Sequence, residues 1–364
     1  MSRFARERRV FFWEEPIIDA TEPLVESYIC PKTGVCVVTP HLPPGGNHEQ
    51  QIHQLLADFA WTRRIVNPIV WFYTPMALQF FPENITPSAV IYDCMDELSM
   101  FRGAPKELKV LEEHLLLRAD LVFTGGISLF EAKRHSHPAV HPFPSGVDVQ
   151  HFAQARGLSD DYAEHVTIPR PRLGYAGVID ERIDLSLVDE VAARCPSWQF
   201  VMIGPVAKIA PESLPRRENI HWLGMKDYQE LPRYFAGWDV ATMPFALNDS
   251  TRFISPTKTP EYLSAGLPII STAIRDVERP YGALGLAKIV HSADEFIAAA
   301  ERAMTSGTCL KCRARADEFL RSSSWDSVWC GMNRLISGAL KDGQAKPVIK
   351  PASHVSIQGA AVHV

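Results

Sequence analysis

Short apolar runs alternate with amphipathic stretches along almost the whole chain. In the first half, strand-like runs occupy residues 8–15, 35–40, 68–75, 89–94 and 120–126. Helical periodicity separates the later runs, at 48–64, 104–118 and 127–134. Strands that are apolar on both faces and alternate with helices are typical of a parallel sheet covered by helices on each side.

The second half repeats this alternation. Its strand-like runs are 172–179, 198–204, 220–224, 239–245, 268–272 and 287–292, and helices are expected at 184–194, 228–237, 258–265 and 293–304. Two such sets predict an α/β protein with two doubly wound, Rossmann-like domains.

The domain limits follow from composition. We expect an N-terminal domain at 1–160 and a second domain at 161–320, because residues 149–171 are polar and end in prolines. A Ser-capped amphipathic helix is expected over 321–340, where it could return to the first domain. The Pro-, Ala-, Gly- and Val-rich residues 341–364 lack periodicity and predict a disordered tail.

Composition excludes several classes of partner. The net charge of −5 disfavours nucleic acid, whose phosphates need clustered Lys and Arg. The sequence contains no run of 18 apolar residues, so no membrane span is predicted. The basic start lacks the features of a signal peptide. Seven scattered cysteines fit a reducing cytoplasm. Four arginines in "SRFARERR" would allow only a weak peripheral contact with the inner face of an anionic membrane.

Several residues after predicted strands of the second half suggest a ligand site. In open parallel sheets, ligands bind beyond the carboxyl ends of the strands. Gly177, Gly204 and Gly224 each lie at such an end, where glycine lets the backbone approach a ligand closely. Arg182 follows the first of these glycines, and Met225 and Lys226 follow the third.

The stretch "TRFISPTKTPEYLSAGLPIIST" predicts an anion site at a helix start. Ser255 is the expected N-cap, followed by a proline and Thr257 in the first turn. Arg252 and Lys258 oppose the helix dipole unless an anion binds there. Glu261, three residues after Lys258, could accept hydrogen bonds from both hydroxyls of a ribose. The alternative is a solvated Lys–Glu surface pair.

The segments "GVID", "HWLGMKDYQELPRYFAGWDVATMPF" and "SPTKTPEYLSAGLPIIST" resemble the donor half of group 1, family 4-like glycosyltransferases, including the teichuronic-acid, TuaH-type branch. The resemblance covers nearly the whole chain and is strongest over 172–272. It implies the GT-B fold, in which two Rossmann-like domains face a cleft. It also implies sugar transfer from a nucleoside-diphosphate sugar without a metal or another cofactor, and the sequence contains no Asp-x-Asp motif.

The same resemblance implies a role for each matching residue. Arg252 and Lys258 would hold the diphosphate, and Glu261 would bind the ribose. Backbone groups at Met225 and Lys226 would contact the nucleobase. The backbone at Gly177 and Gly204 would pass close to the donor.

Two features depart from the family. Phe253 stands where the first glutamate of the paired-glutamate motif, which touches the donor sugar, would lie. The family's opening strand and glycine loop have no match, because "MSRFARERRVFFWEEP" resembles the end of the first helix. The sugar and the stereochemistry therefore stay open, and the first sheet is expected to contain an unpaired strand.

A general base is expected from the first domain. The stretch "YDCMDELSMF" follows a strand and offers Asp93, Asp96 and Glu97 as candidates, with Asp96 preferred. Capping of the next helix is the alternative for Asp93 and Asp96. His41, in "TPHLPPGGNHEQ", is expected at a strand end, where its loop could shape the acceptor pocket.

Together these observations predict a glycosyltransferase that uses a UDP-linked donor and a saccharide or lipid-linked hydroxyl acceptor in cell-surface polysaccharide or glycoconjugate synthesis. Two alternatives remain: a nucleotide-sugar 2-epimerase on the same fold, and an inactive donor-binding protein. Release of UDP that needs an acceptor separates transfer from binding, whereas free product sugar without an acceptor would indicate an epimerase.

Overall fold

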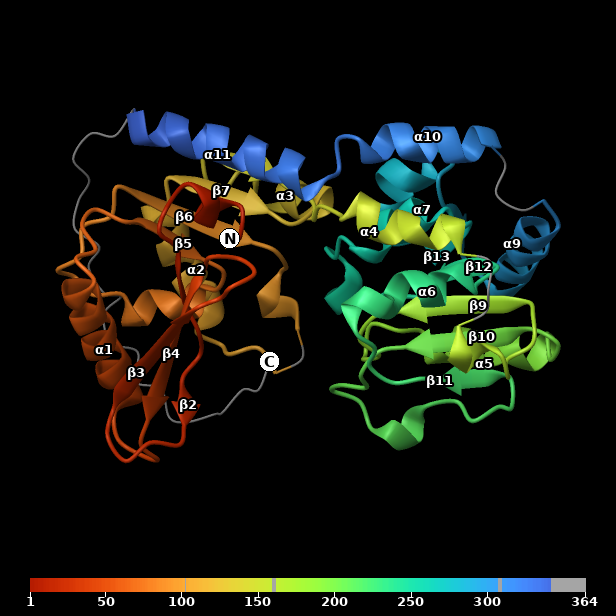
Figure 1. Cartoon of the computed structure of the whole chain (residues 1–364), viewed down its shortest axis with the longest axis horizontal. Helices are drawn as coiled ribbons and strands as arrows, with labels where there is room; N and C mark the ends of the chain where they lie inside the picture. The colour runs from red at the N-terminus through yellow and green to blue at the C-terminus, as the bar shows by residue number, and fades with distance from the viewer. Residues whose placement is uncertain (102, 159–161, 307–309, 342–364) are drawn as a thin grey trace. The chain divides into compact units, whose positions relative to one another are not determined.

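The computed structural model describes residues 1–101, 103–158, 162–306 and 310–341. These residues form two compact units (Figure 1). The first unit contains Met1–Thr124, Ala132–Phe143 and the chain from Trp329, and the second contains Gly125–Glu131 and Pro144–Val328. By these contacts, residues 144–158 belong to the second unit. The tail expected to be disordered lies, from residue 342 on, outside the described residues.

The second unit is built on a six-stranded parallel sheet in the order β11-β10-β9-β12-β13-β14. Its strands are β9 (Arg172–Ala176), β10 (Gln199–Ile203), β11 (Ile220–Trp222), β12 (Val240–Met243), β13 (Ile269–Thr272) and β14 (Lys288–Val290). Every residue of β9, β10, β12 and β13 is buried, which confirms strands covered on both faces. The order in which the chain adds strands to the sheet reverses between β9 and β12. Open α/β sheets bind ligands at such a reversal.

Helices alternate with these strands, as the periodicity predicts. They are α4 (Val149–Ala153), α5 (Leu185–Arg194), α6 (Leu231–Ala236), α7 (Lys258–Ala265), α8 (Arg275–Val277), α9 (Ala293–Ser306) and α10 (Leu310–Leu320). The four expected helices correspond to α5, α6, α7 and α9, and the helices α4, α8 and α10 were not predicted. Phe235 and Tyr262, from α6 and α7, are fully buried with their rings 5.2 Å apart.

The strands of the first unit lie in two sheets. One is parallel, in the order β5 (Ile69–Phe72), β6 (Ala89–Cys94), β7 (Leu121–Thr124) and β8 (Val140–Pro142). In the other, β4 (Cys36–Leu42) pairs with β1 (Phe11–Trp13) and β2 (Ile17–Ile18) in parallel and with β3 (Leu24–Ile29) antiparallel. The five predicted strands are confirmed, whereas β2, β3 and β8 were missed. The helices of this unit are α1 (His48–Thr62), α2 (Leu108–Arg118) and the end of α3 (Ile127–Lys133).

The last described helix is α11 (Trp325–Lys341), in the region where the sequence predicts a C-terminal helix. From Trp329 on it belongs to the first unit. Ile336 is 1% exposed and joins a cluster with Phe4, Ile91 and Phe123, where Trp329 packs edge-on against Phe4. Apolar burial therefore fixes this helix on the β5–β8 sheet.

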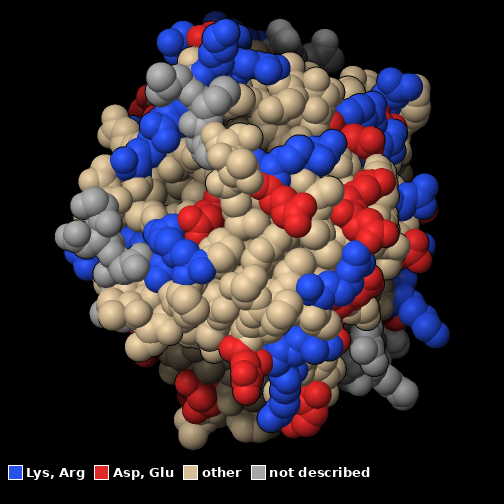
Figure 2. Space-filling model, turned by 90° about the vertical axis from the view of Figure 1, so that its right-hand side faces the viewer, with Lys and Arg blue, Asp and Glu red and all other residues tan. Residues whose placement is uncertain are grey.

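The surface mixes both signs of charge. On the face shown in Figure 2, Lys and Arg side chains are interspersed with Asp and Glu among uncharged residues. Exposed ion pairs of the second unit include Arg194 with Asp294 and Arg217 with Asp189. Within the described chain, no helix combines the length and the apolar character that a membrane span requires.

Candidate functional site

Three of the predicted glycines meet at the carboxyl edge of the second unit's sheet. The Gly177 amide donates to the Ile203 carbonyl and the Gly204 amide donates to the Gly224 carbonyl, each at 2.9 Å. A Cβ on Gly204 would lie 1.9 Å from the Gly177 oxygen, and its φ is +144°. Only glycine fits that position. The ends of β9, β10 and β11 thus form one continuous edge of exposed backbone.

The loops after β9 and β12 are joined where the strand order reverses. The Asp184 amide donates to the Pro244 carbonyl at 2.8 Å, and the Ala246 amide donates to the Arg182 carbonyl at 2.8 Å. The chain that leaves β12 then turns through a capping box at Asn248 and leads into α7. The amino end of α7 therefore starts from the same sheet edge as the glycines.

The start of α7 differs from the sequence prediction in one respect. The N-cap is Thr257, not Ser255, and Thr257 makes no side-chain cap bond in the described structure. The reason is that the chain before Thr257 is not yet helical, so Ser255 lies too early. Ser255 is half-buried and Thr257 is exposed. A helix start without a side-chain acceptor suits an external anion.

Lys258 and Glu261 form a close pair on the first turn of α7. The Lys258 Nζ donates to the Glu261 Oε2 at 2.9 Å. Glu261 is only 8% exposed, so the surface-pair alternative does not describe it. Burial raises the pKa of Glu261, and the nearby Lys258 ammonium opposes that rise. A buried carboxylate costs free energy that a solvated pair does not, which favours a ligand-binding role.

Arg252 provides a second cation just before this helix. Its side chain is exposed, and its guanidinium lies 5.1 Å from the centroid of the Phe253 ring. Across the described ranges it makes no ion pair. Phe253, which replaces the family's glutamate, thus supports the guanidinium through a cation–π contact of about 0.5–1 kcal/mol. This leaves the guanidinium free to face an anion.

Three further predicted residues are placed differently. Arg182 makes hydrogen bonds of 2.6–3.0 Å to both carboxylate oxygens of Asp180. Lys226 pairs with Glu164 at 2.8 Å. Met225 is 78% exposed beside it. Arg182 and Lys226 thus each pair with a protein carboxylate, as Lys258 does, but neither lies at the start of α7. The backbone at Met225 and Lys226 stays the predicted contact.

In the first unit, His41 lies near the end of β4, one residue before Leu42, where the sequence predicted a strand end. It pairs with Ile17 and Leu24 on the two neighbouring strands. Its Nδ1 lies 2.7 Å from the Asp19 carboxylate. The role of its loop at an acceptor pocket stays a prediction.

The two base candidates have different surroundings. Asp93 lies on β6 and is 8% exposed, and it accepts a hydrogen bond from the Trp71 indole at 3.1 Å. Burial raises the pKa of Asp93 to about 6, although that hydrogen bond opposes the rise. Asp96 follows the strand and is half-buried. Asp93 is thus a core residue of the first unit, whereas Asp96 belongs to the loop that follows β6.

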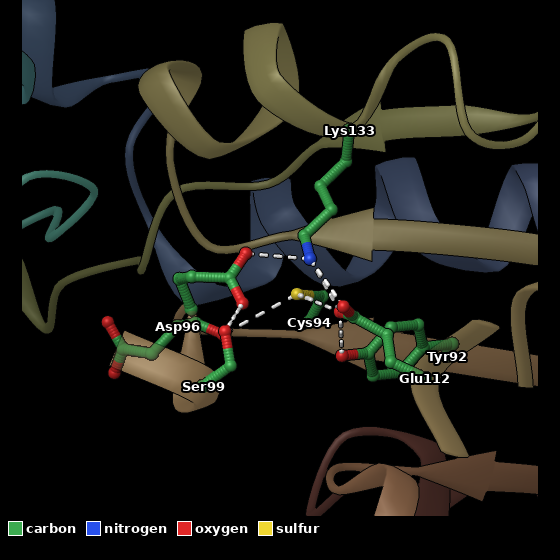
Figure 3. Close-up of polar contacts among 7 residues, drawn as sticks. Tyr92, Cys94, Asp96, Ser99, Glu112 and Lys133 are labelled. Carbon is green, nitrogen blue, oxygen red and sulfur yellow. Dashed lines mark hydrogen bonds and ion pairs between the residues drawn. The ribbon is translucent and has the colours of Figure 1, made fainter. Parts of the chain in front are cut away.

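A buried ionic network anchors the loop that carries Asp96 (Figure 3). The Lys133 Nζ lies 2.7 Å from both carboxylate oxygens of Glu112 and 2.7 Å from Glu97. Ser99 donates to Glu97 at 2.7 Å, and the Tyr92 hydroxyl donates to Glu112 at 2.8 Å. Burial alone would lower the pKa of Lys133, but the two carboxylates raise it.

Within this network, Glu97 ties the loop to α2 and α3, while the Asp96 side chain points away from it (Figure 3). The three charged side chains are 11–12% exposed. The Cys94 thiol lies against Glu112 and the Asp96 carbonyl, and burial raises its pKa to about 12. The loop is therefore held by a lysine shared between two glutamates.

The Asp93→Asn variant is expected to be more stable than the native chain at pH 8, but not at pH 4. The folded pKa near 6 lies above the ordinary 3.8, so ionisation of Asp93 destabilises the fold progressively from about pH 4 to 6. The largest possible gain in the free energy of unfolding is about 3 kcal/mol. Burial of the variant's side-chain amide would offset part of that gain, so we expect a net gain of about 1–2 kcal/mol. Urea unfolding at both pH values measures it, and an equal change at pH 4 and pH 8 would contradict it.

Sequence reasoning missed an aromatic pair beside Glu261. The Asp148 side chain caps α4 by accepting from the His151 amide at 3.0 Å. The His151 Nε2 then lies 2.9 Å from the Tyr228 carbonyl, 77 residues away, and the rings of the two residues stack. The Asp cap before "VQHF" was the only local signal, because the partner comes from a distant segment.

The described residues contain no cluster of three or more His, Cys, Asp or Glu side chains arranged to hold a metal ion. What they bring together is a glycine-lined sheet edge, a helix start, two cations and a buried carboxylate. This combination can bind a phosphorylated ligand that also carries neighbouring hydroxyls.

Comparison with known proteins shows what the chain resembles. Residues 170–306 match the family described as Glycosyl transferases group 1. Over 265 residues, the chain is 26% identical to a Bacillus subtilis protein named as a teichuronic acid biosynthesis glycosyltransferase, TuaH. The match covers 66% of this chain and 64% of the length of that relative.

Solved structures share the fold over most of the chain. Sucrose-phosphate synthase of Thermosynechococcus elongatus superposes with a TM-score of 0.69 at 14% identity, covering 94% of this chain and 92% of that one. HepE of Anabaena, solved with UDP and glucose, gives a TM-score of 0.62 at 14% identity, covering 85% and 87%. The protein therefore has the GT-B fold, and residues 170–306 in its second unit match the group 1 glycosyltransferase family.

Proposed function

We propose that the protein is a glycosyltransferase that moves a sugar from a nucleoside-diphosphate sugar, UDP-linked by preference, to a hydroxyl acceptor. The observation that carries the proposal is the first turn of α7. There a buried Glu261, its Lys258 partner and an exposed Arg252 lie at an uncapped helix start. The solved HepE complex with UDP and glucose, on the same fold, supports the choice of donor.

In the proposed reaction, the acceptor oxygen bonds to the anomeric carbon as the bond from that carbon to the diphosphate breaks. Arg252, Lys258 and the α7 amides stabilise the negative charge that grows on the leaving diphosphate. Glu261 accepts hydrogen bonds from the ribose hydroxyls and so orients the donor. Arg252, Lys258 and the α7 amides would supply the positive charge that a metal ion could otherwise supply, so the proposal includes independence from a metal.

The acceptor loses a proton in the same reaction. If the anomeric configuration inverts, Asp96 is the proposed acceptor of that proton, because its loop is anchored while its side chain points away from the anchor. If the configuration is retained, the acceptor attacks from the face that the diphosphate leaves, and its proton passes to an oxygen of the departing diphosphate. The resemblance to a protein named for teichuronic acid biosynthesis suggests a saccharide or lipid-linked acceptor of the cell surface.

Calorimetric titration of UDP and GDP, without and with EDTA, tests the donor site. We expect UDP to bind more tightly than GDP and its affinity to survive EDTA. Tighter binding of GDP would indicate a GDP-linked donor in place of a UDP-linked one. Loss of binding in EDTA would overturn metal independence. A folded protein that binds neither nucleotide would overturn the donor site.

Turnover then separates transfer from its alternatives. With UDP-linked sugars, we expect UDP release that depends on an added saccharide or lipid-linked acceptor. Free product sugar without an acceptor would indicate a 2-epimerase. Tight UDP binding without turnover in the presence of extracted cell-surface acceptors would indicate a donor-binding protein.

A further inference from the structure

Tyr228 presents an aromatic ring that is rigidly supported on one face and partly open to solvent. The residue is 45% exposed. The His151 ring stacks on it with centroids 4.4 Å apart and planes 9° apart. Phe152, which is fully buried, meets it edge-on at 5.5 Å. A surface tyrosine without a role does not need such support.

The support is itself fixed. His151 is 7% exposed, and its ring is held by the 2.9 Å contact with the Tyr228 carbonyl. Its backbone is held by the Asp148 cap of α4, and α4 packs on α7. The Tyr228 ring therefore has little freedom to lose when a ligand binds.

Tyr228 also lies next to the proposed donor groups. It follows Gly224 by four residues and begins a short 3-10 helix, Tyr228–Glu230, after the carboxyl end of β11. Burial, followed by the charge of Glu261, raises the pKa of Tyr228 to about 12. The charge of His151 in turn acts to lower the pKa of Glu261. The ring, its histidine support and the buried carboxylate thus share one neighbourhood within the second unit.

The chemistry of a nucleotide sets the order of contacts. With the diphosphate at Lys258 and the ribose hydroxyls at Glu261, the base must extend from the ribose away from the diphosphate. An aromatic ring beside Glu261 gives a planar base a surface on which to stack. Such stacking contributes about 1–3 kcal/mol per base.

We propose that Tyr228, supported by His151, is the stacking surface for the nucleobase of the donor. This inference rests on the proposed function and extends it to a residue that determines base affinity. Since stacking tolerates any base, the ring contributes affinity. Discrimination between uracil and guanine is left to hydrogen bonds along the backbone at Met225 and Lys226.

Titration of UDP and inorganic pyrophosphate into the native chain and Tyr228→Leu tests the inference. We expect the UDP affinity to fall by about five- to a hundredfold, while pyrophosphate, which has no base, binds equally to both. Tyr228→Phe keeps the ring and is expected to restore most of the UDP affinity. Tyr28→Leu is the matched control, because Tyr28 is a 61% exposed tyrosine of the first unit.

Each other outcome has a distinct meaning. Equal UDP affinity in Tyr228→Leu and the native chain would overturn the stacking role and leave the diphosphate site intact. A parallel loss of UDP and pyrophosphate would show a general disturbance and also overturn it. If the native chain bound neither probe, the proposed function would fail and this inference with it.

Discussion

Lys258→Ala is expected to weaken UDP binding by about ten- to a hundredfold, the loss of one charge-assisted contact of about 1.5–3 kcal/mol. The Lys258 ammonium is the cation of the first turn of α7, 2.9 Å from the buried Glu261 carboxylate. Its removal takes away a diphosphate contact and leaves a carboxylate that repels the anion. Calorimetry with UDP measures the loss, which should be much smaller for uridine because uridine has no phosphate.

Lys288→Ala is the matched control for that experiment. Lys288 is an exposed lysine that begins β14, at the amino edge of the same sheet and therefore opposite the proposed site. Its variant should bind UDP like the native chain. Equal UDP affinity in Lys258→Ala and the native chain would contradict the diphosphate site, as would an equal loss of affinity for UDP and uridine.

Lys133→Met is expected to destabilise the first unit by about 3–5 kcal/mol, because it leaves Glu97 and Glu112 buried together without their shared cation. Facing carboxylates raise one another's pKa, so the loss should be larger at pH 8 than at pH 5. Cys94 is buried in the same network and reports on the opening of this unit. Pulsed alkylation of Cys94 across a urea series, read by peptide mass spectrometry, gives the free energy.

Two comparisons make this result specific. Lys109→Met removes an exposed lysine of α2 and should change the free energy of opening by less than about 0.5 kcal/mol. Lys133→Met combined with Glu97→Gln removes one of the two facing charges and should recover part of the loss. A Lys133→Met loss below about 1 kcal/mol, or one independent of pH, would show that the network does not stabilise the loop of Asp96.

The sequence determined the local parts of this protein. Apolar runs on both faces predicted the buried strands of the second unit, because strands enclosed in a parallel sheet need apolar residues throughout. Glycines at strand ends predicted a sheet edge where backbone meets backbone, and Gly204 cannot be replaced there. A cation before α7 and another in its first turn likewise predicted a helix start that suits an anion. Each of these signals needs only a few neighbouring residues.

Only the tertiary structure decided which polar residues are buried and what they face. Lys258 and Glu261 have the spacing of a surface pair, and neighbouring elements bury the glutamate. Asp93 and Asp96 look alike in sequence, yet one lies in a core and the other follows the strand. His151 meets Tyr228 across 77 positions, and Lys133 meets Glu112 across 21. The physical reason is that burial and charge pairing depend on segments that only folding brings together.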